Sequence, residues 1–233
     1  MLSMTKGAKI TYKEIVRLNL EKHSNVQSLF FVEFEGYDLF QERVELTNEL
    51  KSCFDFALEF REQYNMPFWD GFNLSLFNKN FSDHSFLSQI KHHNPKSEIY
   101  TVDSLDFFDF INNWPIDRYL TINSKVKMSN NQTRHFILLD FHIPVNKENQ
   151  KICSEVMRCL NLTGYLLVSG KSYHFYGNEL YSEEELLQVL STSLLYSPII
   201  DRAWIAHQLI EKSCCLRVTS KYGYHPYLVE EIN

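Results

Sequence analysis

The hydrophobic and polar positions in the second half of the chain predict short strands that alternate with helices. The segment RHFILLDFHIP (134–144) is almost continuously apolar, which is typical of a buried strand. A helical period follows over 146–162, and two apolar runs then meet at Ser169-Gly170. Two further helices and a closing hairpin are predicted at 182–195, 200–212, 214–220 and 226–232. The predicted order from residue 134 is therefore β-α-β-β-α-α-β-β.

The first half of the chain has a less regular pattern. Helical spacing predicts helices over 11–22 and 42–64, and the alternation of DGFNLSLFN (70–78) predicts a half-buried strand. Other expected elements are strands at 26–35 and 97–104, a short helix at 105–114, a weak helix or loop at 81–95 and a hairpin turn at 129–132. Capping boxes, in which a glutamate follows a hydroxyl residue by three positions, predict helix starts at Thr11 and Ser182.

Together these elements predict one compact α+β domain made of two units. The β-α-β-β order with antiparallel pairs predicts an RRM-like unit over 131–233. A small α/β unit over 1–130 is expected to pack on it. The boundary between the two is expected in the polar stretch 124–133.

Composition narrows the possible partners. The net charge of −6 argues against a protein that coats long nucleic acid, because such binding needs Lys and Arg to neutralise phosphates. A local basic pocket for one nucleotide or a short strand is still compatible with this charge. The chain has no apolar run of about 18 residues and no apolar leader, so we expect a cytoplasmic protein without membrane association. The five cysteines lack metal-type spacing and are expected to be reduced.

The tripeptide GKS (170–172) has the letters that end a P-loop. A P-loop has four residues between its glycines and a helix after GKS. Here the upstream Gly164 is one residue too far away, the intervening YLLVS is strand-forming, and the YHFYG that follows is also strand-like. We therefore expect a turn between two strands at this place and no phosphate loop.

Asp140 and His142 share one face of the strand predicted at 134–144, because they are two residues apart. A carboxylate in such an apolar segment needs an explanation, since acids are rarely fully buried unless paired. Asp140 either caps a loop at the strand end or presents its carboxylate to a substrate or a divalent cation. Asp201, in contrast, is predicted only as the N-cap of the helix at 200–212.

Ser172 and His174 lie on one face of the following strand. Their side chains run parallel and cannot readily form a nucleophile–base pair, so a serine hydrolase is not expected. His174 is either a satisfied core histidine or a donor to a nucleotide phosphate. Arg217 lies in an apolar strand and needs either a buried acid or a phosphate as its partner. Lys221 follows four residues later, where that strand ends.

Several short motifs in this order resemble the archaeo-eukaryotic primase superfamily. They are ILLDFH (137–142), SYHFYG (172–177) and CCLRVTSKYGYHP (214–226). With IDRAWIAHQL (200–209) before the last of them, the chain looks like the compact primase-like proteins associated with mobile elements. The resemblance implies template-directed nucleotidyl transfer with two divalent metal ions held by acids. Nucleoside triphosphates and a single-stranded nucleic-acid template are the implied partners.

The resemblance also assigns roles to individual residues. Asp140 is expected to hold Mg²⁺ or Mn²⁺ with the assistance of His142, and Ser172 is expected to support His174. The residues expected to bind the triphosphate are His174, Arg217 and Lys221, with Ser172 beside them.

This chain departs from the superfamily pattern at two places. His142 replaces the second acid of the first motif, and the late strand carries Arg217 but no aspartate. Imidazole suits transition metals better than Mg²⁺. Two interpretations follow: a primase-polymerase that uses Mn²⁺ through Asp140 and His142, or a catalytically inactive relative that binds nucleotides or nucleic acid or acts as a scaffold.

Overall fold

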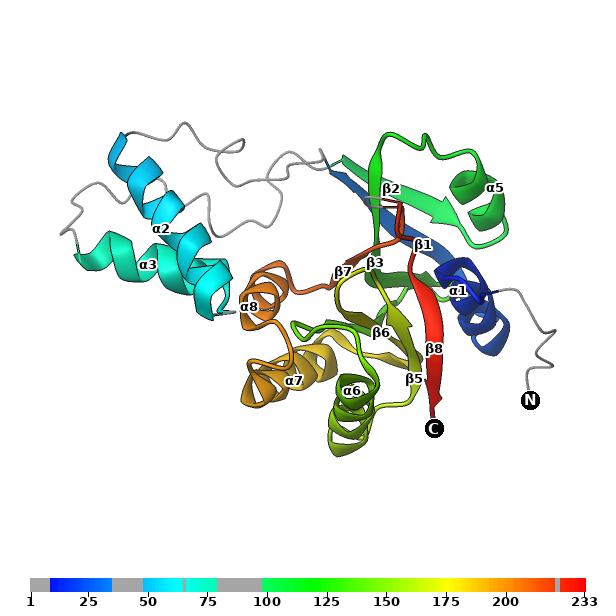
Figure 1. Ribbon diagram of the computed structural model, residues 1–233. Helices are drawn as coiled ribbons and strands as arrows, with labels where there is room; N and C mark the ends of the chain where they lie inside the picture. The colour runs from blue at the N-terminus through cyan, green and yellow to red at the C-terminus, as the bar shows by residue number, and fades with distance from the viewer. Residues whose placement is uncertain (1–8, 35–47, 65, 79–97, 221–222) are drawn as a thin grey trace. The chain divides into compact units, whose positions relative to one another are not determined.

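A computed structural model describes residues 9–34, 48–64, 66–78, 98–220 and 223–233 (Figure 1). The chain divides into two units, which are described separately. The first comprises residues 1–35 together with 96–233, and the second comprises residues 36–95. The predicted boundary at 124–133 instead falls inside the first unit, where these residues form a hairpin. The segment predicted at 81–95 lies outside the described residues.

The first unit is a mixed α+β fold around an antiparallel sheet. The strand order is β2-β1-β3-β4-β6-β5-β8, and β7 pairs with β3 beside this path. The strands are β1 (Val26–Phe34), β2 (Glu98–Asp103), β3 (Tyr119–Met128), β4 (Thr133–Asp140), β5 (Gly164–Val168), β6 (Tyr173–Tyr181), β7 (Cys215–Arg217) and β8 (Tyr227–Ile232).

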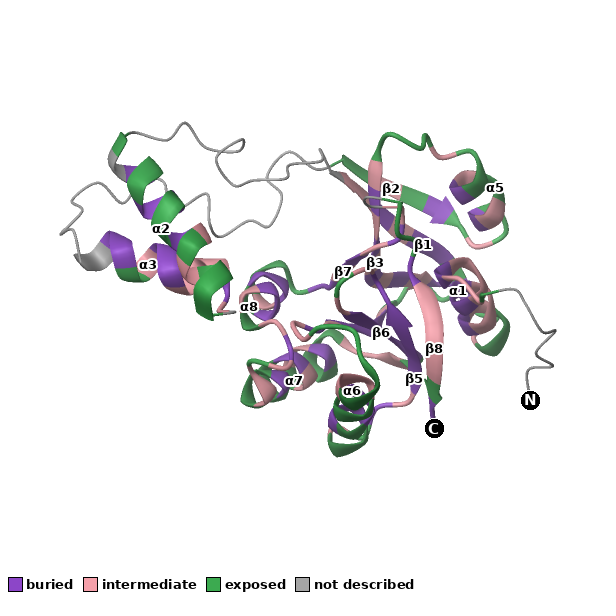
Figure 2. Ribbon diagram, in the orientation of Figure 1, coloured by how far each residue is buried: buried purple, intermediate pink, exposed green. Residues whose placement is uncertain are grey.

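The first unit also contains helices, and those after residue 134 follow the order predicted from the hydrophobic pattern. They are α1 (Tyr12–Lys22), α5 (Phe107–Asn112), α6 (Lys147–Cys159), α7 (Glu183–Ser193), the 3-10 turn η2 (Leu194–Tyr196) and α8 (Arg202–Glu211). Strand β5 and most of β4 and β6 are buried (Figure 2), as expected for central strands covered on both faces. Among the described residues, no helix is both long and apolar enough to cross a membrane.

The second unit contains a helical pair, α2 (Asn48–Tyr64) and α3 (Phe68–Asn78), with a small hydrophobic core of its own. Its buried side chains are Leu50, Cys53, Phe54, Ala57, Phe72 and Leu76. Gly71 of α3 allows close packing, because a Cβ there would lie 3.1 Å from atoms of Ala57 and Phe60. The strand predicted at 70–78 is therefore wrong. Phe72 and Leu76 are four residues apart, and this spacing fits one face of a helix as well as one face of a strand.

One prediction about strand pairing also fails. The closing hairpin does not form, because β7 pairs with β3 and β8 pairs with β5. Two apolar runs near each other in sequence do not determine their partners, which here are long-range. The helix starts predicted at Thr11 and Ser182 are both confirmed, since these residues are the N-caps of α1 and α7. The Thr11 side chain makes no capping hydrogen bond, whereas the box of Ser182 and Glu185 is complete.

Gly164 at the start of β5 provides a test of this packing. Its φ is +154°, and a Cβ would lie 2.2 Å from the Tyr176 carbonyl oxygen. We expect Gly164→Ala to lower the unfolding free energy by about 3 kcal/mol or more, because strain and a backbone clash add. Urea denaturation should show this loss. Gly223→Ala is the matched control, since φ there is +80° but no atom lies within 4 Å, and it should cost only about 1 kcal/mol. Equal effects of the two substitutions would contradict the close approach of β5 and β6.

Candidate functional site

The site is built first on the pairing of β4 with β6, which places Asp140 opposite His174. Neighbouring side chains on one face of an antiparallel pair lie close enough to interact. Here His174 Nε2 is 3.6 Å from Asp140 Oδ1. The His174 side chain is almost fully buried, whereas the Asp140 side chain retains 28% exposure. The two side chains thus lie beside each other on neighbouring strands.

A second acidic residue, Asp201, lies opposite Asp140 in the segment that precedes α8. The Asp201 N–H donates to the Asp140 carbonyl oxygen at 3.0 Å, and the His142 N–H donates to the Ile199 carbonyl oxygen at 2.8 Å. The chain before α8 therefore runs antiparallel to the end of β4. His142 lies just beyond that strand end, and its Nδ1 is 3.7 Å from Asp201 Oδ2.

Asp201 is the N-cap of α8, as predicted, but capping uses only one of its oxygens. Oδ1 accepts hydrogen bonds from the N–H groups of Ala203 and Trp204, at 2.9 and 3.0 Å. These bonds fix the orientation of the carboxylate, because they satisfy donors that a helix start leaves without partners. Oδ2 remains turned toward His142 and can bind a ligand.

The two carboxylates interact electrostatically. Burial is the main cause that raises the pKa of Asp140 well above its usual value, and the negative charge of Asp201 raises it further. Arg217 opposes this shift. Two acids held together where water is partly excluded repel each other, and a bound cation would relieve that repulsion.

His174 is a neutral imidazole at physiological pH. Burial, and secondarily the positive charge of Arg217, lower the pKa of His174 to about 3. Its contact with Asp140 is therefore not an ion pair of two charged groups.

Three buried polar atoms around this place lack a hydrogen-bond partner within the described part of the chain. They are Nδ1 of His174, Nε2 of His142 and the hydroxyl of Tyr176. Native proteins leave few buried polar groups unsatisfied, because each costs about 1–3 kcal/mol. Their gathering near two carboxylates is typical of a site prepared for a polar ligand.

Arg217 on β7 supplies positive charge to the site. Its guanidinium donates to the carbonyl oxygen of Ser169 at 2.7 Å and to those of Thr219 and Tyr224. These bonds link the β5–β6 turn to the segment between β7 and β8. Among the described residues, no ion pair joins Arg217 to a carboxylate. The expected pairing of Arg217 with a buried acid is therefore not observed there. The positive charge of Arg217 contributes to the low pKa of His174.

The other predicted residues contribute less. Ser172 lies in the turn before β6, where its carbonyl oxygen accepts from the Ser169 N–H at 3.0 Å, and the contacts seen there involve its backbone only. Gly170 has a φ of +126° and forms the predicted turn. Because β6 follows this turn directly, no helix is present to make GKS a phosphate loop. Lys221 lies outside the described residues.

Sequence reasoning missed Asp201 as a site residue, and it overlooked Tyr176. A signal for Asp201 was present, since two apolar residues precede the acid in IID as they do in LLD at Asp140. The capping pattern gave a sufficient local explanation, so a second role was not considered. No local signal identifies Tyr176, which is 2% exposed and lies on β6 two residues after His174.

The residue types fit a divalent cation, although the side chains do not form a closed metal shell. Among the described residues, no group of three His, Cys, Asp or Glu side chains is gathered as a metal ion would require. Mg²⁺ is commonly held by one or two carboxylates together with water and substrate phosphates. Asp140 and Asp201 meet that requirement. His142 fits a metal ligand in another way, since its Nε2 has no partner while its Nδ1 faces a carboxylate.

Comparison with known protein families agrees with the resemblance noted in the sequence. The family model described as archaeo-eukaryotic primase 1D-like matches residues 101–230, more than half of the chain. The chain belongs to this primase-like family. The match begins in β2 and ends in β8, so it includes Asp140, His174, Asp201 and Arg217. No curated protein and no solved structure matches the chain. The resemblance seen in the sequence is thus confirmed at the level of the family.

The raised pKa of Asp140 predicts that Asp140→Asn increases the free energy of unfolding, by an amount that depends on pH. Because its folded pKa is raised, the folded state binds more protons than the unfolded chain, and stability falls as pH rises above the unfolded value of about 3.9. With a chelator present, Asp140→Asn should be more stable than wild type at pH 8, by about 1 kcal/mol or more. The difference should shrink as the pH falls toward about 4.

Thermal or urea unfolding across this pH range measures the effect. Asp117→Asn, at an exposed position, is the matched control and should leave stability unchanged. A less stable Asp140→Asn variant at pH 8 would contradict the repulsion between the two acids.

Proposed function

We propose that the protein binds a nucleoside triphosphate with Mg²⁺ or Mn²⁺ and catalyses nucleotidyl transfer on a nucleic-acid template. Membership of the primase-like family supports the reaction class. The observation that carries the proposal is the meeting of Asp140 and Asp201, held together by the hydrogen bond from the Asp201 N–H to the Asp140 carbonyl oxygen. Nothing in the packing of a hydrophobic core would favour such a pair.

In this proposal Asp140 and Asp201 hold the cation. His142 assists them, and its imidazole favours Mn²⁺ over Mg²⁺. When bound, divalent cations at such sites stabilise charge on the attacking and leaving oxygens of phosphoryl transfer. The helix cap of Asp201 keeps the carboxylate in one orientation, so little reorganisation is needed when a ligand arrives.

The triphosphate would lie on the side of His174 and Arg217. A neutral His174 can donate a hydrogen bond to a phosphate oxygen without adding charge. The terminal nitrogens of Arg217 already donate to backbone carbonyls, so its contribution would be mainly the positive potential. We retain Ser172 and Lys221 as secondary phosphate contacts. We also retain the RRM-like description for the β4-α6-β5-β6 core of the first unit.

A second candidate is a protein that binds nucleotides or nucleic acid but does not transfer nucleotides, including one that acts as a scaffold. One observation favours it, namely that His142 stands where the superfamily pattern has an acid. This candidate predicts the same triphosphate site without catalytic turnover.

Extension of a labelled primer on a single-stranded template, with Mn²⁺ or Mg²⁺ and labelled nucleotides, tests the proposal. Wild type should extend the primer, preferably with Mn²⁺. Asp140→Ala and Asp201→Ala should each reduce the rate at least about 100-fold, because several kcal/mol of charge stabilisation is lost. Asp117→Ala, at an exposed position, should extend as wild type does.

Nucleotide binding measured on the same samples separates the two candidates. Metal-dependent triphosphate binding without extension would favour the inactive binding protein. The absence of both extension and nucleotide binding in folded wild type would overturn the proposal and the nucleotide-binding form of the second candidate.

A further inference from the structure

One side of α2 in the second unit carries a row of aromatic rings. Phe56, Phe60 and Tyr64 follow one another at intervals of four residues, which brings them to neighbouring positions on the helix. The ring centroids of Phe56 and Phe60 are 5.8 Å apart, and those of Phe60 and Tyr64 are 5.0 Å apart. Phe56 is 40% exposed and Tyr64 is 57% exposed. We call these three residues the aromatic row.

The aromatic row is not needed to fill the core of its own unit. The buried core residues of α2 are Leu50, Cys53, Phe54 and Ala57, and none of the three rings is among them. Only Phe60, the partly buried ring of the row, approaches α3 closely, at Gly71. Leaving apolar area in water costs roughly 25 cal/mol per Å². Exposed aromatic side chains that stack on one another are typical of a surface that a partner covers.

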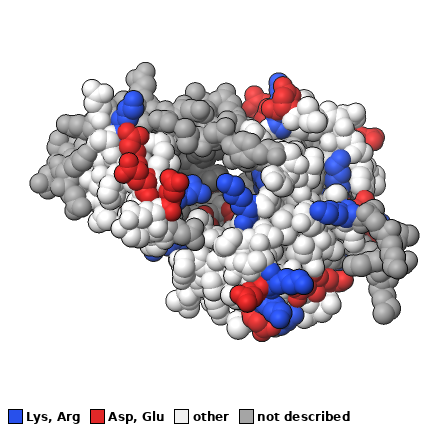
Figure 3. All heavy atoms as spheres, viewed as in Figure 1, with Lys and Arg blue, Asp and Glu red and all other residues white. Residues whose placement is uncertain are grey.

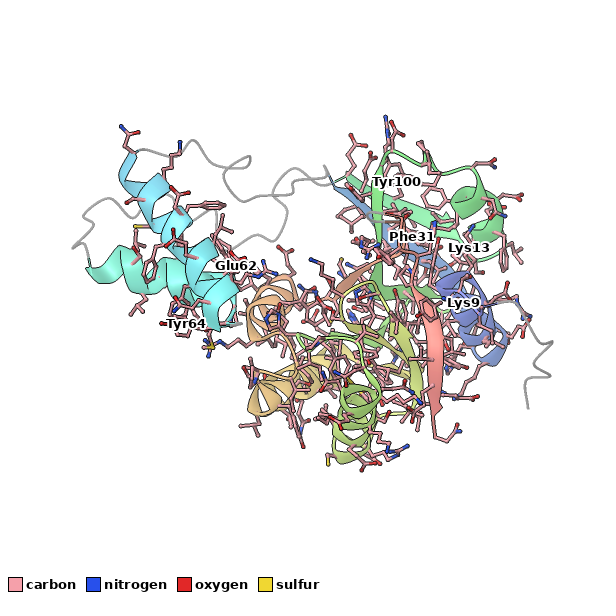
Figure 4. The ribbon with its side chains drawn as sticks, in the orientation of Figure 1. Lys9, Lys13, Phe31, Glu62, Tyr64 and Tyr100 are labelled. Atoms are coloured by element: carbon pink, nitrogen blue, oxygen red, sulfur yellow. The ribbon has the colours of Figure 1, made fainter. Side chains whose placement is uncertain are left out.

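Acidic residues lie beside the aromatic row. Asp55, Glu59 and Glu62 are exposed and recur at intervals of one helical turn. We call them the acidic row; Figure 3 shows acidic side chains gathered along α2, and Figure 4 shows Glu62 and Tyr64 near its C-terminal end. Within the described part of the chain, none of the three forms an ion pair. Like charges one turn apart repel each other, so the row lowers helix stability unless a cationic partner binds.

The charges of the acidic row decide which partner fits. Aromatic side chains can stack on the bases of single-stranded nucleic acid, but such sites also need a basic groove for the phosphates. Here the charges beside the rings would repel phosphates and anionic lipid alike. A second copy of the chain, joined by a symmetric interface, would bring one acidic row against another. Electrostatic complementarity therefore favours a basic protein segment.

We propose that α2 is a docking surface for a basic amphipathic helix of another protein. Apolar side chains of that helix would cover the aromatic row, and its Lys or Arg residues would pair with the acidic row. Aromatic side chains are frequent anchors in protein interfaces. The proposal concerns only the second unit and does not depend on nucleotide binding by the first.

The test uses the full chain and a fluorescent helical peptide that has Leu on one face and Lys on the other. The peptide is matched in length to α2. Fluorescence anisotropy should show saturable binding of this peptide, and the same peptide with Glu for Lys should not bind. Phe56→Ser with Tyr64→Ser should weaken binding by about tenfold or more, a loss that corresponds to about 1.4 kcal/mol. Neutralisation of the acidic row by Asp55→Asn, Glu59→Gln and Glu62→Gln should weaken it to a similar degree.

The matched control is neutralisation of three exposed acids of the first unit, Asp106→Asn, Asp109→Asn and Asp117→Asn. It removes the same charge and should leave affinity within about twofold, a change expected from long-range electrostatics alone. Equal weakening by this control would show non-specific attraction and overturn the proposal. The proposal would also be overturned if wild type bound oligo-dT and the double variant Phe56→Ser, Tyr64→Ser did not. Self-association of wild type that the same variant loses would also overturn it. Because the acid-neutralised variant alters only exposed side chains, it keeps the test decisive if the aromatic variant fails to fold.

Discussion

The candidate site depends on one constraint, which is that two aspartates lie opposite each other at the end of β4 although their charges repel. The hydrogen bond from the Asp201 N–H to the Asp140 carbonyl oxygen fixes the backbone, and the cap of α8 fixes the Asp201 side chain. Burial and mutual repulsion raise the pKa of Asp140. Such an arrangement lowers the stability of the folded chain at neutral pH and is typical of functional sites, where binding takes precedence over stability.

The surrounding groups fit this constraint. Arg217 adds positive charge while its guanidinium is engaged by backbone carbonyls, so the cation is partly buried without a direct ion pair to either acid among the described residues. His174 remains neutral because burial and Arg217 disfavour its protonation. The result is a site with two acids, one neutral imidazole and one fixed positive charge. These are the types of group that bind a metal-bound triphosphate, in which cation and phosphates carry opposite charges.

The sequence allowed prediction where contacts are local or follow from strand order. The turn at Gly170 could be predicted, because adjacent apolar runs joined by a short turn pair with one another. The position of His174 opposite Asp140 depends instead on the pairing of β4 with β6, which the expected RRM-like sheet implied. The partner of Asp201 could not be predicted, since its contact with β4 depends on how the chain crosses between α7 and α8. The partner of β7 could not be predicted either, since its contact with β3 joins segments far apart in the sequence. In α3, a run of only nine residues was too short for its alternation to distinguish strand from helix. The separate helical unit between β1 and β2 was missed because no glycine- or proline-rich stretch marks its boundaries in the sequence.

The central claim is that Asp140 and Asp201 together form a cation site, and calorimetric titration of Mn²⁺ into the nucleotide-free protein tests it most directly. Wild type and Asp201→Ala should be compared, with Asp117→Ala as the control at an exposed position. The account predicts saturable binding to wild type and to the control, and binding at least about tenfold weaker in Asp201→Ala, because a single carboxylate is left. Equal Mn²⁺ affinity in wild type and Asp201→Ala would contradict it.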